Sequence, residues 1–168
     1  MNPTRLLPTW RSLLYVPVNV DRFVEKAHLR GADCIQLDLE DAVPVKEKAY
    51  ARTLVPTVAP LVARGGADVV VRINRPLSMA VRDIEHTICP DVNGIAITKA
   101  DSASHVSLLD ELVTELEEKR GMPVGHTKFI TMIETPEAFF QINEIAGAGS
   151  RIVACCIGGE DFALNCNM

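Results

Sequence analysis

Two acidic residues stand out because each directly follows a short apolar run. Glu134 follows residues 129–133, and Asp161 comes soon after residues 152–157. The segment between these runs, about 136–146, has the pattern of a helix, so the order is strand, helix, strand. Such a unit places its two strands parallel, and parallel strands end at the same edge of a sheet. We therefore expect the two carboxylates to face the same space.

Two carboxylates with no Cys or His beside them suit a hard divalent cation that binds oxygen. We predict that Glu134 and Asp161 bind Mg²⁺. A plainer interpretation also fits the spacing: Glu134 would lie in the first turn of a helix, and Asp161 would be an ordinary loop acid. Spacing alone leaves both interpretations open.

The rest of the chain alternates between strand-like and helix-like segments, which predicts a parallel sheet covered by helices. The six predicted strands lie within residues 12–16, 34–37, 68–74, 94–97, 129–133 and 152–157. The five predicted helices lie within residues 22–30, 44–54, 79–88, 102–120 and 136–146. Pro56 and Pro60 are expected to break or restart the second helix.

Two α/β architectures fit this alternation: an open doubly wound sheet and a (β/α)8 barrel of the TIM type. Nearly every predicted strand ends in polar or charged residues, namely Asp38, Glu40, Asp41, Arg72, Asn74, Lys99, Glu134, Glu160 and Asp161. A barrel gathers such groups from many strands into one mouth, whereas an open sheet concentrates them at one switch point. The glycine-rich nucleotide fingerprints GxGxxG and GxxxxGK[ST] are absent. We therefore predict an incomplete TIM barrel of about six strands.

Composition excludes several classes of partner. The 17 Lys and Arg against 22 Asp and Glu give a formal charge of −5 with no basic run, which argues against nucleic acid. No apolar run approaches the roughly 18–20 residues that span a bilayer, so no membrane partner is expected.

The five cysteines are odd in number and form no CxxC pair. Cys34, Cys155 and Cys156 are predicted to be buried in strands, which favours a reducing, cytoplasmic location.

Seven short motifs in this order resemble one known group of enzymes. They are residues 11–17, 31–33 with 38–43, 48–52, 71–74, 99–100, 133–138 and 158–162. Together they resemble the citrate lyase β-subunit-like group, with the malyl-CoA and citramalyl-CoA lyases, in the HpcH/HpaI aldolase superfamily. The motifs cover nearly the whole chain.

The resemblance implies a TIM barrel of the phosphoenolpyruvate/pyruvate type and a set of site residues. Glu134 and Asp161 would bind Mg²⁺ and, with Arg72, form the catalytic group. Arg72 would also bind oxygen atoms of the substrate, and Arg11 and Lys99 would join it as substrate-binding residues.

Three further acids, Asp38, Glu40 and Asp41, are expected to surround the metal and Arg72 rather than to bind the metal directly. Two roles stay open for each of the basic residues. Arg72 could pair with Asp38 or Glu40 instead of binding substrate, and Lys99 could bind phosphate or pair with Glu40.

Members of this group continue with two more strand–helix units and a segment that carries a catalytic Asp. We therefore expect residues 1–168 to form a single amino-terminal portion of a TIM-barrel catalytic domain whose carboxyl-terminal part is missing. The resemblance also implies a homo-oligomer, of the trimeric type in relatives.

The predicted activity is Mg²⁺-dependent cleavage of a carbon–carbon bond in a short 3-hydroxyacyl thioester of the citryl, malyl or citramalyl type. The products would be a keto acid and an acyl thioester, formed through an enolate, with CoA or an acyl-carrier protein as the carrier. One alternative is a class II HpaI-type aldolase that acts on free keto acids. Another is a truncated, non-catalytic paralogue that associates with full-length subunits.

Overall fold

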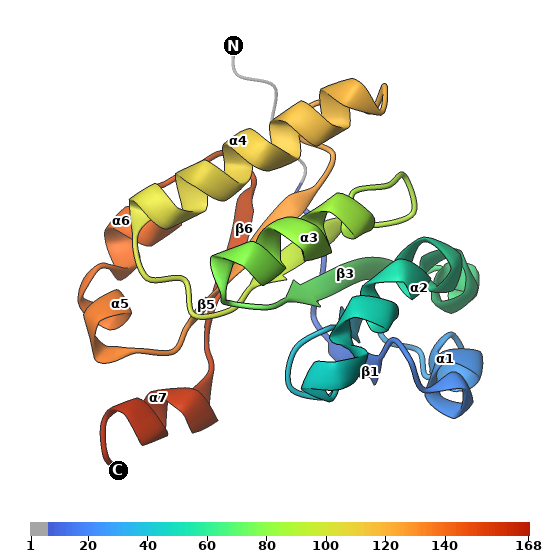
Figure 1. Ribbon diagram of the computed structural model, residues 1–168, viewed down its shortest axis with the longest axis horizontal. Helices are drawn as coiled ribbons and strands as arrows, with labels where there is room; N and C mark the ends of the chain where they lie inside the picture. The colour runs from blue at the N-terminus through green and yellow to red at the C-terminus, as the bar shows by residue number, and fades with distance from the viewer. Residues whose placement is uncertain (1–6) are drawn as a thin grey trace.

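The fold is a parallel sheet with helices between its strands (Figure 1). The computed structural model describes residues 7–168. Within them, six strands lie side by side in chain order: β1 (Leu13–Pro17), β2 (Cys34–Asp38), β3 (Asp68–Ile73), β4 (Gly94–Ile97), β5 (Lys128–Ile133) and β6 (Ile152–Ile157). The α-helices are α1 (Asp21–Ala27), α2 (Lys48–Val62), α3 (Leu77–Thr87), α4 (Ala103–Lys119), α5 (Pro136–Phe140), α6 (Ile142–Ala146) and α7 (Gly159–Asn165). Two 3₁₀ turns, η1 (Val45–Glu47) and η2 (Ala63–Gly65), flank α2.

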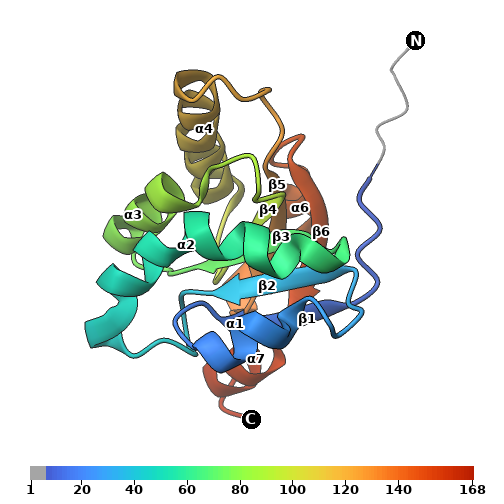
Figure 2. The same ribbon diagram turned by 90° about the vertical axis from the view of Figure 1, so that its right-hand side faces the viewer.

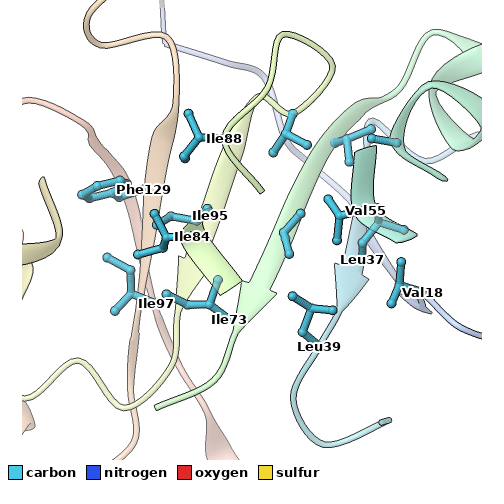
Figure 3. Close-up of a cluster of buried hydrophobic side chains, with 14 of the residues drawn as sticks. Val18, Leu37, Leu39, Val55, Ile73, Ile84, Ile88, Ile95, Ile97 and Phe129 are labelled. Carbon is cyan, nitrogen blue, oxygen red and sulfur yellow. The ribbon is translucent and has the colours of Figure 1, made fainter. Parts of the chain in front are cut away.

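The main core lies between the outer face of the sheet and the helices. Alternate strand residues such as Leu37, Ile73 and Ile97 point outward and pack against apolar side chains of the helices, including Val55 of α2 and Ile84 of α3 (Figure 3). Because strand side chains alternate between faces, the residues between them point to the other side of the sheet.

The inner face carries a second, smaller apolar cluster. Cys34, Val70, Ala96, Ile130 and Met132 meet there. A parallel sheet buried on both faces is expected for a barrel-type α/β fold, and the predicted architecture is confirmed. The sheet is not closed: across residues 7–168, β1 and β6 are its two ends and do not pair with each other (Figure 2).

Helix α2 contradicts the predicted break at its prolines, because it runs without interruption from Lys48 to Val62. Pro56 and Pro60 are four residues apart and both are exposed, whereas Val55 and Ala59 of the same helix are buried. The proline rings therefore lie on the solvent side of the helix, and packing of the opposite, buried face holds the helix together.

Two differences concern the carboxyl-terminal part. The helix predicted over 136–146 is two short helices, α5 and α6, which meet at Gln141. Helix α7 was not predicted, and it lies beyond the carboxyl end of β6, at the bottom of Figures 1 and 2.

The prediction that three strand cysteines are buried is right for Cys34 and wrong for Cys155 and Cys156. Both exposed thiols belong to β6, which has a neighbouring strand on one side only among the described residues. Residues 7–168 contain no helix that is long and apolar enough to cross a membrane.

Candidate metal and oxyanion site

The site is built at the carboxyl edge of the sheet, beginning with Asp38 and Arg72. These residues are partners in the register between β2 and β3, so their side chains emerge next to each other. Arg72 Nη2 lies 2.7 Å from Asp38 Oδ2, and Arg72 Nε lies 2.9 Å from Oδ1. This two-point geometry is the strong form of a guanidinium–carboxylate pair. Both residues are buried.

Two further acids complete the surroundings of Arg72. Its Nη1 lies 3.0 Å from Glu40 Oε2 and 3.0 Å from Asp41 Oδ2. Its guanidinium carbon also lies 5.3 Å from the centre of the Tyr15 ring. Arg72 therefore forms ion pairs with both Asp38 and Glu40, as one of its two predicted roles required. Asp41 differs from the other two acids because 68% of its side chain is exposed.

Burial and pairing shift the pKa values of these acids in opposite directions. Burial acts to raise the pKa of Asp38, but donation from Arg72 and from the backbone N–H groups of Glu40 and Ala42 lowers it overall. For Glu40 burial prevails, and its pKa is raised despite Arg72 and Lys99 nearby. The surroundings of Asp38 thus favour its charged form, whereas those of Glu40 disfavour it.

A buried clamp holds the loop that carries Glu40 and Asp41. Lys48 Nζ donates to the carbonyl oxygens of Leu39 (3.0 Å) and Glu40 (2.5 Å) and to Asn74 Oδ1 (2.6 Å). The Asn74 side chain in turn donates to Leu39 O (3.0 Å) and to Asp83 of α3 (2.7 Å). The clamp ties α2, α3 and the end of β3 to this loop.

Glu134 lies between the end of β5 and the helix that follows. Thr135 is the N-cap of α5, so Glu134 precedes the helix and is not in its first turn. Its Oε2 accepts a hydrogen bond from the backbone N–H of Lys99 at 2.5 Å. Burial raises the pKa of Glu134, and the Lys99 N–H group offsets part of this effect.

Gly158 lies directly against the Glu134 carboxylate. A Cβ atom at position 158 would be 2.4 Å from Glu134 Oε1 and 2.5 Å from its Cγ, far closer than real contacts allow. Glycine at this position therefore leaves room for the observed orientation of Glu134.

Asp161 lies in the first turn of α7 and is not a loop residue. Its Oδ2 is 2.5 Å from Lys99 Nζ, which also lies 3.1 Å from Glu40 Oε1. A pocket of about 150 Å³ opens here, and its lining includes Asp41, Arg72, Glu134 and Asp161. The structure thus brings the two predicted metal ligands to one pocket.

Negative charge is in excess in this pocket and its walls. Among the described residues, Arg72 and Lys99 pair with acids of this group and Lys48 lies nearby, so three bases stand against five acids, namely Asp38, Glu40, Asp41, Glu134 and Asp161. Such an excess favours a cation. No group of three or more His, Cys, Asp or Glu side chains in the described part of the chain is arranged to hold a metal. Two carboxylates fit Mg²⁺, which often keeps water and substrate oxygens as its other ligands.

Arg11 is the one predicted site residue that the structure places elsewhere. It precedes β1 and pairs with Asp33, which precedes β2, at 2.7 Å. Both residues therefore lie at the amino edge of the sheet, so the structure does not bring Arg11 to the pocket, and its role in substrate binding stays a prediction.

Three residues that sequence reasoning missed support the site: Gly158, Lys48 and Asn165. The Gly158-Gly159 pair before two acids was a usable signal that another group lies close to the backbone there. The role of Lys48 had no local signal, since the pattern of its helix suggests a solvated face. Asn165 Nδ2 donates to Glu134 O at 3.0 Å and fastens α7 to the end of β5.

A larger hollow of about 450 Å³ lies between β1 and α1. Its charged lining residues are the bases Arg22, Lys26 and Arg30, and it has no acid to bind a metal. This hollow shares no lining residue with the pocket of Glu134 and Asp161.

Comparison with known proteins gives a consistent result. The citrate lyase subunit beta of Haemophilus influenzae is 34% identical over 157 residues, covering 92% of this chain and 54% of its own length. The L-malyl-CoA/beta-methylmalyl-CoA lyase of Cereibacter sphaeroides is 32% identical over 164 residues, covering 94% of this chain and 51% of its own. The citrate lyase beta subunit of Mycobacterium tuberculosis, solved with oxaloacetate and magnesium, matches with a TM-score of 0.66 and 26% identity, over 92% of this chain and 60% of its own.

The chain spans about half the length of the curated relatives that it matches. Residues 11–168 match the model of one family, whose description covers both aldolases and citrate lyases. This chain belongs to the HpcH/HpaI aldolase/citrate lyase family.

Proposed function

We propose that this chain provides the metal-binding and oxyanion-binding residues of a carbon–carbon lyase that cleaves a short 3-hydroxyacyl thioester. The observation that carries the proposal is the pocket where Glu134 and Asp161 meet beside Arg72. Relatives named for citrate lyase and malyl-CoA lyase activities support the thioester class.

Glu134 and Asp161 would hold Mg²⁺ in this proposal. Bound Mg²⁺ would supply Lewis-acid polarisation of the keto-acid oxygens. The two carboxylates approach from β5 and α7, and Gly158 keeps the Glu134 carboxylate in place. The M. tuberculosis relative was solved with magnesium and a keto acid, which supports this assignment.

Arg72 would bind the oxygen atoms on which negative charge develops as the carbon–carbon bond breaks. A guanidinium recognises a planar, charged oxygen pair with two parallel hydrogen bonds. Asp38 holds Arg72 in a fixed orientation, whereas the exposed Asp41 is the partner that a substrate oxygen would replace most readily. In this step the hydroxyl proton would pass to water, the O–H electron pair would form the carbonyl of the keto acid, and the carbon–carbon pair would remain on the thioester as an enolate. Water would then return a proton to the enolate carbon.

A second candidate is an aldolase that acts on free keto acids. The matched family description includes aldolases as well as citrate lyases, which favours testing this activity. Assays with malyl-CoA and citramalyl-CoA against free 4-hydroxy-2-keto acids separate the two. Cleavage of the free acids alone would replace the thioester proposal.

Calorimetric titration with Mn²⁺ tests the metal ligands. We expect Glu134→Gln to lose most of the Mn²⁺ affinity, because an amide is a far weaker ligand than a carboxylate. Glu137→Gln is the matched control, since Glu137 is exposed on α5 nearby. Equal affinity in wild type and Glu134→Gln would remove Glu134 from the site.

A further inference from the structure

Lys99 touches both of the proposed metal ligands, through two different groups. Its backbone N–H donates to Glu134 at 2.5 Å, and its ammonium lies 2.5 Å from Asp161 Oδ2. The same ammonium lies 3.1 Å from Glu40 Oε1. A single residue at the end of β4 therefore connects the acids that follow β2, β5 and β6.

The backbone of Lys99 adopts a conformation that side chains disfavour. Its φ is 47°, and within residues 7–168 only Asn167 shares a positive φ among residues other than glycine. Such a conformation is unfavourable for an L-residue that carries a side chain. Contacts at both the N–H and the ammonium hold Lys99 in this state, which directs both groups toward the pocket.

The Lys99 ammonium competes with any metal for Asp161. It is the only basic side chain within ion-pair distance of Asp161 among the described residues. Two cations on one carboxylate oxygen repel each other strongly in a partly buried site. A cation at Asp161 therefore requires the ammonium to leave Oδ2.

The Lys99 ammonium can move from Asp161 toward Glu40 and solvent. Its side chain is 29% exposed, so the ammonium can move without being dehydrated further. Glu40 is already within 3.1 Å and can remain its partner. The ammonium would then stand beside the pocket, where it could bind an anionic group of the substrate.

We propose that Lys99 is an exchangeable counter-ion of the metal site. Its ammonium neutralises Asp161 while no metal is bound and withdraws to Glu40 when a divalent cation takes its place. This inference rests on the proposed function, since it takes Glu134 and Asp161 as the ligands.

Chemical labelling of lysine amines in the wild-type chain tests the exchange directly. The chain is treated with acetic anhydride with and without saturating Mn²⁺, and acetylation of each lysine is measured by mass spectrometry. We expect the labelling rate of Lys99 to rise several-fold with Mn²⁺, because it loses one of its two acidic partners. The exposed Lys46 is the internal control and should not change. An unchanged Lys99 rate while Mn²⁺ is bound would overturn the exchange.

Calorimetry on variants provides the second test. We expect Lys99→Met to bind Mn²⁺ about tenfold more tightly, because the metal no longer displaces an ion pair. Lys46→Met is the matched control: Lys46 is an exposed lysine and pairs with neither Glu134 nor Asp161. Lys99→Met should also melt at a lower temperature without metal and gain more from Mn²⁺ than wild type. Equal or weaker Mn²⁺ binding by Lys99→Met would make Lys99 a structural residue only.

The outcomes separate the two proposals. If wild type binds Mn²⁺, Glu134→Gln does not, and both Lys99 tests show no effect, only the exchange fails. If neither wild type nor Lys99→Met binds Mn²⁺, the metal site fails and the exchange fails with it.

Discussion

At the scale of single residues, a few contacts fix the orientation of Arg72 and Glu134. Asp38 fixes Arg72 by two hydrogen bonds, and Gly158 leaves Glu134 just enough room. Neither Asp38 nor Gly158 is expected to contact a substrate. Each acts by restricting a neighbouring side chain, which is how residues around a metal tune its ligands.

We expect Gly158→Ala to weaken Mn²⁺ binding by about 10–100-fold, because the new methyl group displaces the Glu134 carboxylate. Gly159→Ala is the control, since a Cβ at Gly159 has no atom within 4 Å. Calorimetric titration of both variants measures the effect. Identical affinities for the two variants would contradict the role given to Gly158.

At the scale of elements, buried charged clusters join segments that are distant in sequence. Lys48 of α2 holds the loop after β2, as described above. At the other end of the sheet, Arg151 precedes β6 and lies 2.7 Å from Glu117 of α4. Glu117 also accepts the backbone N–H groups of Gly125 and Thr127, each at 2.7 Å. These clusters fix the helices relative to the strands.

Replacing Lys48 by Met leaves two buried carbonyl groups without this donor. We expect the free energy of unfolding to fall by about 1–3 kcal/mol. Urea denaturation of Lys48→Met against Lys46→Met measures the difference, since Lys46 is exposed two residues away. A loss shared equally by both variants would assign the effect to the loss of a positive charge in this segment instead.

Removing the charge of Glu117 leaves the buried Arg151 with less compensation. Glu117→Gln is expected to lower the free energy of unfolding by about 3 kcal/mol. Glu118→Gln, on the exposed side of the same helix, should change it little. Denaturant titration compares the variants. Asp110 also pairs with Arg151, and a Glu117→Gln variant as stable as wild type would show that this pair alone is sufficient.

The same pair predicts a dependence of stability on pH. Burial acts to raise the pKa of Glu117, but donation from Arg151 and from two backbone N–H groups lowers it overall. The unfolded chain therefore binds the proton first, at about pH 4.3. The contribution to stability is complete above that pH and is lost as the pH falls through the lower native pKa. Unfolding measured along an acid series should show a shallower loss in Glu117→Gln than in wild type.

The open sheet is the dominant feature of the whole molecule. Across residues 7–168, β1 and β6 each lack a second neighbouring strand, and β6 exposes Ala154, Cys155, Cys156 and Ile157. Exposed sheet edges pair readily with other chains, and a lysine on the edge discourages such pairing.

We expect this chain to self-associate as its concentration rises, and Cys155→Lys to reduce that association. Val45→Lys is the control because Val45 is 81% exposed but lies outside the sheet. Sedimentation velocity in the presence of a reducing agent measures the effect without disulfide formation. A chain that stays monomeric, or one that both variants affect alike, would contradict the role of the β6 edge.

Sequence alone was sufficient for the order of the six strands and for placing the acids at one edge of the sheet. Hydrophobic alternation reports which faces are buried, and parallel strands must share one end, so Glu134 and Asp161 meet for reasons that are local in the chain. The same rule places Arg11 at the opposite edge, because it precedes its strand.

Only the tertiary structure decided the contacts between distant segments. The ion pair of Lys99 with Glu40 was one of the two roles predicted for Lys99. Its contact with Asp161 was not predicted, because it joins the ends of separate strands and no spacing in the sequence encodes it. The prolines of α2 are tolerated because their side of the helix is exposed, a property of packing rather than of residue type. Periodicity reports one face of one element, whereas an ion pair depends on the positions of all the elements that hold it.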